Sequence, residues 1–318
     1  MAPRRNNKID NRWDLNRATT EDSSPTKVAL SYTFYQRSYM QPPDRYAVFG
    51  HPIGHSKSPR IHALFAEQTG EQLSYTAQDV PPETFETCVR DFFAQGGKGL
   101  NCTVPLKELA WRIADYRSER AEHSKAVNTL ALRPDGMIYG DNTDGIGLIR
   151  DLTVNLKLSL NNRRILLLGA GGASRGIIGP LLEQRPSHLT IANRTPEKAA
   201  QLAEEFCDLG PISGCGFFDL GTESFDLILN ATAASLAGEL PNLPKNILRP
   251  RGCCYDLAYG MEPTPFVRWG EEAGADISVD GIGMLVEQAA EAFFIWRGMR
   301  PETRPVIDVL NRERRGSR

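Results

Sequence analysis

The chain has 318 residues, of which 41% are hydrophobic and 24% charged, and its formal net charge is -2 at pH 7. The length predicts two domains, and the composition is that of an ordinary soluble globular protein. Charges of both signs are interspersed, which argues against nucleic acid or an anionic membrane as partner and favours a small molecule. No stretch approaches the roughly 18 apolar residues of a membrane helix, and the N-terminus lacks an apolar signal core, so we expect a cytosolic protein.

The cysteines and histidines form no pattern of a metal site or a disulfide framework. The six cysteines contain no C-x-x-C pair, and the neighbours Cys253 and Cys254 cannot easily bond each other. We therefore expect free, mostly buried thiols in a reducing compartment. The five histidines show no H-E-x-x-H or similar ligand spacing, so no protein metal site is expected.

The first 44 residues differ in texture from the rest of the chain. Residues 1–44 are rich in Arg, Asn, Asp, Ser and Pro, and their few apolar residues follow neither a helical nor a strand period. The sequence therefore predicts a disordered N-terminal extension. Met40 lies just before the predicted folded part, which leaves open whether the preceding stretch is an upstream extension or a misassigned start.

The predicted fold begins with the short apolar run Tyr46–Gly50, which indicates a strand leading into the loop His-Pro-Ile-Gly. Ser58 followed by Pro59 predicts a helix start, with a side-chain cap and then a proline at the first helical position. Residues 131–139 contain Arg-Pro-Asp-Gly between extended stretches, which predicts a hairpin leading into Asp-Asn-Thr-Asp-Gly at 141–145.

The second half alternates predicted strands and helices. The aliphatic run Ile165–Leu168 predicts a parallel strand buried on both faces, and Leu189–Ala192 and Phe225–Leu229 predict two more. A helix follows the first strand, and Thr195 with Pro196 should cap the helix after the second. Strand, helix, strand, helix, strand indicates a doubly wound α/β domain.

A last helix is predicted from about Met284 to Trp296. Its core stripe is expected at Leu285, Ala289, Ala292 and Phe293. Met284 and Gln288 are one turn apart and share a different face.

The turn after the strand 165–168 has the pattern of a dinucleotide-binding loop. Gly169, Gly171 and Ser174 occupy the three positions of G-x-G-x-x-G, with a small residue in place of the third glycine. The backbone can still approach a pyrophosphate there. A tight turn without a ligand is the alternative, which the preceding strand and following helix disfavour.

The tip of the second strand indicates which dinucleotide is bound. NAD enzymes place Asp or Glu here to bond the ribose 2′-hydroxyl, whereas this chain has Asn193-Arg194-Thr195 with Lys198 a turn later. Arg194 and Lys198 can pair with a 2′-phosphate. A solvated basic helix start is the alternative, but positive charge opposes the helix dipole there unless an anion offsets it. The residues therefore predict NADP.

Eight short motifs cover nearly everything after residue 45. They are Ser56-Lys57-Ser58-Pro59, Asn101-x-Thr103-x-Pro105-x-Lys107, Ala126-Val127-Asn128-Thr129, Asp141-Asn142-Thr143-Asp144-Gly145, Gly169-Ala170-Gly171-Gly172-Ala173, Asn193-Arg194-Thr195, Tyr255-Asp256-x-x-Tyr259 and Asp280-Gly281-x-Gly283-Met284-Leu285-x-x-Gln288. In this order they resemble the shikimate dehydrogenase family. One departure is Ala233-Ala234-Ser235, where the family often shows serines and a glycine, so the contacts of this loop to the cofactor stay open.

The resemblance implies an oxidoreductase acting on a CH–OH group, which reduces 3-dehydroshikimate to shikimate with NADPH in chorismate and aromatic amino acid biosynthesis. It implies Lys107 and Asp144 as the catalytic pair. It places around the substrate Ser56, Ser58, Thr103, Asn128, Tyr259 and Gln288. It places around the cofactor Gly169, Ala170, Gly171, Gly172, Ala173, Asn193, Arg194, Thr195, Lys198, Leu257, Gly281 and Met284, the last two at the nicotinamide end.

These residue types suit the chemistry independently of the family. Reducing a ketone with a hydride requires a proton donor at the developing alkoxide, and a lysine ammonium both stabilises that charge and delivers the proton. Serine hydroxyls near a helix start suit a carboxylate, and the amides of Asn128 and Gln288 can bond ring hydroxyls in both directions. Taken singly, such residues are more often a surface lysine, a turn-forming aspartate, a helix cap or surface amides.

We therefore expect two α/β domains, with the active site in the cleft between them. The substrate domain is predicted over 45–143 plus 281–318, and the Rossmann-type NADP domain over 144–280. An NAD-using quinate/shikimate dehydrogenase should carry an acidic residue at the second strand tip, and a non-catalytic NADP sensor should have lost Lys107 or Asp144. Quinate as a poor substrate and a homodimer stay open.

Overall fold

The computed structural model describes residues 42–241, 243–244 and 246–316, and every structural statement below concerns these residues. The predicted disorder over 1–44 falls outside this part of the chain, except that the first strand already begins at Asp44. The strands are β1 (Asp44–Gly50), β2 (Leu73–Asp79), β3 (Gly97–Cys102), β4 (Tyr116–Arg117), β5 (Thr129–Leu132), β6 (Ile138–Asp141), β7 (Arg164–Leu168), β8 (His188–Asn193), β9 (Ile212–Gly216), β10 (Phe225–Asn230), β11 (Leu248–Asp256) and β12 (Ile277–Asp280). The helices are α2 (Ser58–Thr69), α3 (Phe85–Ala94), α4 (Lys107–Ile113), α5 (Glu119–Ser124), α6 (Asp144–Arg150), α7 (Gly172–Glu183), α8 (Pro196–Glu205), α9 (Pro265–Glu272), α10 (Ile282–Arg297) and α11 (Thr303–Gly316).

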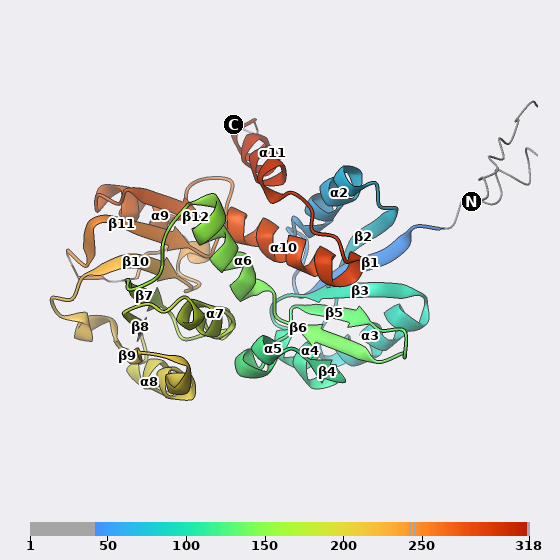
Figure 1. Cartoon of the computed structure of the whole chain (residues 1–318), viewed down its shortest axis with the longest axis horizontal. Helices are drawn as coiled ribbons and strands as arrows, with labels where there is room; N and C mark the ends of the chain where they lie inside the picture. The colour runs from blue at the N-terminus through green and yellow to red at the C-terminus, as the bar shows by residue number, and fades with distance from the viewer. Residues whose placement is uncertain (1–41, 242, 245, 317–318) are drawn as a thin grey trace, which may run out of the picture. The chain divides into compact units, whose positions relative to one another are not determined.

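The first sheet is mixed and has the order β2-β1-β3-β5-β6-β4 (Figure 1). β1 pairs in parallel with β2 and β3, and β5 forms antiparallel pairs with β3 and β6. The β5–β6 pair confirms the hairpin predicted over 131–139. One face of this sheet packs on α3, α4 and α5, and its other face meets α2 and α10.

Alternation along β1 explains how both faces of the first sheet are buried. Ala47 and Phe49 point into the cluster with α3, whereas Tyr46 stacks on Trp296 of α10 with ring centroids 4.8 Å apart. Successive side chains of a strand point to opposite faces, so one apolar strand serves two layers. The aromatic residue on α10 thereby anchors a C-terminal helix to an N-terminal strand.

The second sheet is parallel throughout and has the order β12-β11-β10-β7-β8-β9. Read from β7, this is the 3-2-1-4-5-6 order of a dinucleotide-binding fold, with its switch point between β7 and β10. Leu166 and Leu168 of β7 face one helical layer and Ile165 and Leu167 the other, and all four are fully buried. The doubly wound α/β fold predicted from the aliphatic run is confirmed.

Four expectations about single elements were wrong. β9 lies between α8 and β10 in the chain. The strand predicted at Phe225 is therefore the fourth strand of this sheet in chain order, and not the third. The helix expected from about Met284 to Trp296 exists as α10 (Ile282–Arg297). It is not the last helix, because α11 follows it. Leu285 is only partly buried, because it packs against the core with α2 and α11 but also lines the cavity described below. Ser58 is the first residue of α2 instead of its cap, because the chain already has helical backbone angles at Lys57.

Two helices connect the sheets. α6 follows the last strand of the first sheet and precedes β7, and α10 follows β12 and packs on α6, β3 and β5 (Figure 1). α6 continues into a π-helical turn, η2 (Asp151–Asn155). Within the described part of the chain, no helix combines the length and apolar character needed to cross a membrane.

Candidate active site

Lys107 and Asp144 form an ion pair next to the ends of two strands of the first sheet. Lys107 opens α4 shortly after β3, and Asp144 opens α6 shortly after β6. Nζ of Lys107 donates to Oδ2 of Asp144, and the two side chains are 23% and 12% exposed. Opposite charges withdrawn from water to this extent attract each other more strongly than a surface pair.

Hydrogen bonds fix the orientation of the Asp144 carboxylate. Its second oxygen accepts from Nδ2 of Asn128 at 2.8 Å, and its backbone N–H donates to Oδ1 of Asn142 at 3.1 Å. Asn128 is fixed in turn, because its Oδ1 accepts from the N–H of Thr143 at 2.9 Å. One oxygen of Asp144 is therefore committed to the ammonium and the other to an amide.

Gln288 brings α10 to the same cluster. Its Oε1 lies 3.4 Å from both Nδ2 of Asn128 and Oγ1 of Thr143, and its Nε2 donates to the carbonyl of Leu285 at 2.8 Å. The two contacts at 3.4 Å are long for hydrogen bonds. The amide of Gln288 therefore retains capacity for the hydroxyl groups of a ligand, whereas Asn128 already bonds Asp144, Thr143 and Thr129.

Two glycines let α6 approach both of its neighbours. A Cβ on Gly145 would lie 2.4 Å from Cγ of Pro180 on α7, and one on Gly147 would lie 2.7 Å from the backbone nitrogen of Gln288 on α10. Only glycine permits helices to pack this closely. Asp144 consequently lies against α7, where a Cβ on Gly176 would be 3.6 Å from its Oδ2.

A cavity of about 390 Å³ opens onto the ion pair. All eight residues expected at the substrate or in the chemistry line it, namely Ser56, Ser58, Thr103, Lys107, Asn128, Asp144, Tyr259 and Gln288. Four residues expected at the cofactor line it as well, namely Ala173, Leu257, Gly281 and Met284. The cavity thus joins residues from both sheets.

Protonation states in the cavity favour neutral hydrogen-bonding groups beside the ion pair. Burial, with Asp280 nearby, raises the pKa of the Tyr259 phenol above its ordinary value. Burial likewise raises the pKa of the Cys102 thiol, and the nearby Lys107 lowers it only in part. Both groups therefore stay protonated at neutral pH.

The glycine-rich turn after β7 leaves space for a ligand. Gly169 has φ +101°, and a Cβ there would lie 3.2 Å from the backbone of Ala231 after β10. A Cβ on Gly171 or Gly172 would meet nothing within 4 Å among the described residues. Oγ of Ser174 donates to the carbonyl of Gly169 at 2.8 Å, which secures the turn. A pyrophosphate fits here because α7 begins at Gly172 with its N–H groups free of helical partners.

The tip of β8 presents positive charge to solvent. Arg194 and Lys198 are exposed, and neither makes an ion pair with any residue that the structure describes. Nδ2 of Asn193 donates to the carbonyl of Thr195 at 3.0 Å. Thr195 occupies the cap position of α8 as expected, but without a side-chain capping bond among the described residues. The unpaired cations fit the phosphate group that the sequence predicts at this position.

Three models of shikimate dehydrogenase domains match the chain. They are the shikimate dehydrogenase substrate binding domain over residues 48–130, shikimate / quinate 5-dehydrogenase over 152–237, and the shikimate 5′-dehydrogenase C-terminal domain over 281–310. A shikimate dehydrogenase (NADP(+)) of Methylococcus capsulatus is 68% identical over 276 residues, which make up 87% of this chain and 99% of that protein. The chain belongs to the shikimate dehydrogenase family. Another such enzyme, of Alkalilimnicola ehrlichii, is 57% identical over 85% of this chain and 99% of its own length.

Solved structures of the family share this fold. Shikimate 5-dehydrogenase of Thermus thermophilus, in complex with NADP(H) and shikimate, is 34% identical and superimposes with a TM-score of 0.76 over 85% of this chain and 99% of that one. The Ael1 enzyme of Pseudomonas putida is 50% identical, with a TM-score of 0.78 over 84% of this chain and 98% of that one. The two-domain α/β architecture expected for the family is therefore confirmed.

Sequence reasoning gave no role to Asn101, which also lines the cavity. Its Nδ2 donates to the carbonyl of Asn128 and to Oγ1 of Thr129, both at 3.0 Å, and its Oδ1 accepts from the Tyr75 hydroxyl at 2.7 Å. Asn101 belongs to the same family motif as Thr103 and lies near the end of a strand. That position could have indicated a place at the site. Tyr75 comes from a different strand and carries no motif, so the sequence could not pair it with Asn101.

Ser56 and Ser58, the two serines of the family motif, both lie at the cavity, and Ser58 does not cap α2 as predicted. Both line the cavity, and the backbone N–H of Ser58 lies 3.3 Å from Oγ of Ser56. Ser58 is buried in the first turn of α2, and Pro59 follows it in the helix. Both hydroxyls can therefore face a ligand carboxylate.

The loop in which the chain departs from the family is secured by buried hydrogen bonds. Oγ of Ser235 donates to Oδ2 of Asp256 at 2.6 Å, and Nδ2 of Asn230 donates to Oδ1 of Asp256 at 3.0 Å. The side chain of Thr232 donates to Oδ1 of Asn230 at 2.7 Å. Ser235 thus ties this loop to the end of β11.

One of the cysteines, Cys102, lines the cavity. All six cysteines lie in the described part of the chain as free thiols, with Cys102, Cys253 and Cys254 buried and Cys207 exposed. No cluster of three or more His, Cys, Asp or Glu side chains suited to a metal ion occurs among the described residues.

Proposed function

We propose that this protein is an NADP-dependent shikimate dehydrogenase that reversibly reduces the ketone of 3-dehydroshikimate to the hydroxyl of shikimate. The observation that carries the proposal is the Lys107–Asp144 pair at one cavity with all the residues expected at the substrate. The relatives of highest identity described above carry the same activity in their names. Such a reaction belongs to the biosynthesis of chorismate and aromatic amino acids.

Lys107 acts as the proton donor to the developing alkoxide. NADPH, when bound, supplies the hydride. The ammonium of Lys107 stabilises negative charge on the carbonyl oxygen and passes a proton to it, and in the reverse direction the amine accepts that proton. Asp144 aims the ammonium, because its own orientation is set by Asn128 and Asn142. The charges are in place before the substrate arrives, so little reorganisation is needed.

The substrate carboxylate and hydroxyls would meet different parts of the cavity. Ser56 and Ser58 offer hydroxyl donors to the carboxylate near the start of α2. The amide of Gln288 can accept from and donate to ring hydroxyls, and Asn128, which lines the same cavity, holds Asp144 in place. Thr103 and the neutral phenol of Tyr259 also line the cavity. A polyhydroxylated acid suits this lining better than an apolar ketone.

The cofactor would lie along the carboxyl edge of the second sheet. Its pyrophosphate would bind the turn Gly169–Ala173, and its 2′-phosphate would pair with Arg194 and Lys198 beside Asn193 and Thr195. Its nicotinamide end would meet the cavity at Leu257, Gly281 and Met284. No acidic residue stands at the tip of β8, which favours NADP over NAD.

Domain limits and cellular setting are part of the same proposal. The substrate domain would comprise 45–143 with 281–318, and the NADP domain 144–280, with the cleft between them as active site. The free cysteines and the composition support a cytosolic enzyme. We propose a homodimer as its oligomeric state, to be checked by light scattering.

One assay tests the function. Cofactor reduction is followed with shikimate or quinate as substrate and with NADP or NAD as oxidant. Shikimate with NADP should give the largest kcat/KM. Equal rates with quinate, or a preference for NAD, would instead favour a quinate/shikimate dehydrogenase with relaxed selectivity.

A further inference from the structure

The first turn of α10 is completed by a residue from another element. Backbone N–H groups in the first turn of a helix have no partner within the helix. Here the N–H of Met284 donates to the Tyr255 hydroxyl of β11 at 3.2 Å, and the N–H of Ile282 donates to Oδ1 of Asp280 at 3.3 Å. Tyr255 therefore supplies an acceptor that the helix itself lacks at Met284.

Asp151 sets the direction of the Tyr255 hydroxyl. The phenol is fully buried and donates to Oδ2 of Asp151 at 2.7 Å, and Asp151 is itself 4% exposed. A phenol has one proton, so donation to Asp151 leaves its lone pairs for the N–H of Met284. The N–H of Met284 thus donates to Tyr255, and Tyr255 donates to Asp151.

The same carboxylate lies directly against the helix turn. A Cβ on Gly283 would be 2.1 Å from either oxygen of Asp151, so this position of α10 admits only glycine. Asp151 begins the π-helical turn that continues α6, and α6 begins with Asp144. One continuous segment therefore carries Asp144 at one end and contacts the first turn of α10 at the other.

Asn155 extends the chain of hydrogen bonds to a second buried carboxylate. Its Nδ2 donates to Oδ1 of Asp151 at 2.9 Å and to Oε1 of Glu287 at 3.0 Å. Glu287 also accepts from Nε of Arg150 at 3.0 Å and from Oγ1 of Thr303 at 2.6 Å. Thr303 reaches this network through Glu287 but, among the described residues, makes no hydrogen bond to the first turn of α10.

The turn needs this support because cavities border it on two sides. Gly281 and Met284 line the cavity with the ion pair. Ile282 and Gly283 line a second cavity of about 390 Å³, together with Asp151. Ile282 is buried in the core with α2 and α11, whereas Met284 is only partly buried, so the hydrogen bond at Met284 adds to the restraint of the turn on the cavity side.

We propose that Tyr255 and Asp151 are positioning residues for hydride transfer, acting through the N–H of Met284 on the turn of α10 that meets the nicotinamide. The inference rests on the proposed function, because that function places Gly281 and Met284 at the nicotinamide. Loss of the phenol oxygen leaves a buried N–H unpaired and frees the turn. The catalytic ion pair is untouched by that change.

The test compares Tyr255→Phe with Thr303→Val, which removes a hydrogen bond from the far end of the same network. For Tyr255→Phe we expect kcat/KM for NADP to fall on the order of tenfold. KM for shikimate should stay near the wild-type value. The isotope effect with NADPH deuterated at the transferred hydrogen should increase, because hydride transfer becomes slower relative to the other steps. Thr303→Val should lower the melting temperature and leave the kinetic constants and the isotope effect unchanged.

Two results would overturn the inference. One is a Tyr255→Phe protein with wild-type kinetics and isotope effect, and the other is the same losses in Thr303→Val. If Tyr255→Phe does not fold, Asp151→Asn decides, with a smaller loss in the same direction expected and unchanged constants contradicting the proposal. If the wild type does not oxidise shikimate, the proposed function fails. The affinity for NADPH, measured by fluorescence titration, then still tests the inference. An unchanged NADPH affinity in Tyr255→Phe would contradict it.

Discussion

The substrate side and the cofactor side of the site differ in how many of their polar groups are already paired. On the substrate side, Lys107, Asp144 and Asn128 bond one another and are largely buried. On the cofactor side, Arg194 and Lys198 are exposed and form no ion pair within the described residues. The first group is organised in advance, and the second has its charges available for an incoming anion.

This difference indicates how each side contributes to catalysis. Charges fixed before the substrate binds can stabilise the transition state without rearranging, so they should act mainly on kcat. Charges without a protein partner gain theirs only when the ligand binds, so they should act mainly on affinity and cofactor choice. Variants on each side of the site, and in the elements behind it, test this contrast.

The largest effect is expected at Lys107. Its ammonium faces little charge on the ground-state ketone and a nearly full charge as the hydride arrives, so its interaction strengthens in the transition state. Lys107→Ala should lose on the order of 10²-fold or more in kcat, with a much smaller change in KM, and Asp144→Asn should also be slow. Steady-state kinetics at saturating shikimate and NADP across pH measure both.

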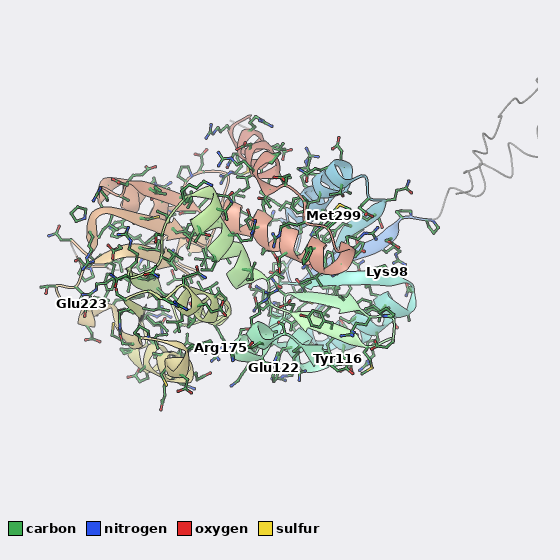
Figure 2. The ribbon with its side chains drawn as sticks, viewed as in Figure 1. Lys98, Tyr116, Glu122, Arg175, Glu223 and Met299 are labelled. Atoms are coloured by element: carbon green, nitrogen blue, oxygen red, sulfur yellow. The ribbon has the colours of Figure 1, made fainter. Side chains whose placement is uncertain are left out.

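The exposed Lys98 provides the control for Lys107, and Figure 2 labels it on β3. Lys98→Ala should behave as wild type. A Lys107→Ala enzyme with nearly normal kcat and a raised KM would make Lys107 a binding residue and remove the contrast.

Arg194 tests the cofactor side. Arg194→Ala should raise KM for NADP by about tenfold or more, since a charge-assisted hydrogen bond is lost, while the weak activity with NAD stays unchanged. Kinetics with both cofactors measure the selectivity, and Arg90→Ala on the exposed surface of α3 is the control. If the constants for NADP do not move, the phosphate is bound elsewhere.

A substitution at Gly147 tests how closely α6 must pack on α10. Gly147→Ala would force a Cβ to within 2.7 Å of the backbone of Gln288, so we expect a destabilisation of about 1–3 kcal/mol. Gly179→Ala is the matched control in α7, where the nearest atom would be 3.8 Å away, and it should stabilise slightly. Urea unfolding compares the two, and equal stability would mean that α6 has room to move.

His62 tests the support behind the substrate side. It is buried, stacks on Tyr75 with centroids 4.2 Å apart, and neither ring nitrogen has a hydrogen-bond partner in the described chain. Burial lowers its pKa from 6.5 to about 3. The unfolded chain therefore binds a proton below pH 6.5 that the folded protein does not.

Stability should consequently fall as the pH drops below 6.5, by about 1.4 kcal/mol per pH unit from this residue. His62→Phe should lose that part of the pH dependence, whereas His123→Phe on the exposed face of α5 should keep it. Urea unfolding at pH 7 and pH 5 measures the difference. Identical pH dependence in His62→Phe and the wild type would contradict the assignment.

The smallest effect is expected from the N-terminus. Deleting residues 1–39 should leave kcat, KM and melting temperature unchanged, because the sequence there has no periodic apolar pattern. Kinetics and thermal unfolding of the shortened protein test this. A marked loss of kcat or of melting temperature would mean that activity or stability depends on residues outside the described structure.

The fold was predictable wherever local pattern decides it. The short aliphatic run 165–168, ended by a glycine-rich turn, indicates a strand buried on both faces, and the turn after it follows from its glycines. β9 was missed because Ile-Ser-Gly-Cys-Gly carries neither a run of apolar residues nor a clear alternation. The start of α2 was misplaced by one residue because the conformation of Lys57, which no propensity specifies, decides it.

The site was predictable where a residue belongs to a family motif and not where its role depends on a distant partner. Asn101 is oriented by Tyr75, and the backbone N–H of Met284 donates to the hydroxyl of Tyr255. Each of these contacts joins segments far apart in the chain. Arg175 on α7, which Figure 2 labels, shows the same limit outside the site, because its ion-pair partner Glu205 belongs to α8.

The order in which the chain is made has a consequence for its nascent state. The apolar face of α2, with Ile61 and Phe65, is covered by α10 and α11, which follow it by roughly 200 residues. At about 5–20 residues per second, a ribosome needs roughly 10 to 40 s to supply that cover. The second sheet can close in the meantime, because β7 to β12 are all complete before α10 emerges. The substrate half, although its first strands are translated earliest, is therefore the last to finish folding and the one most in need of a chaperone.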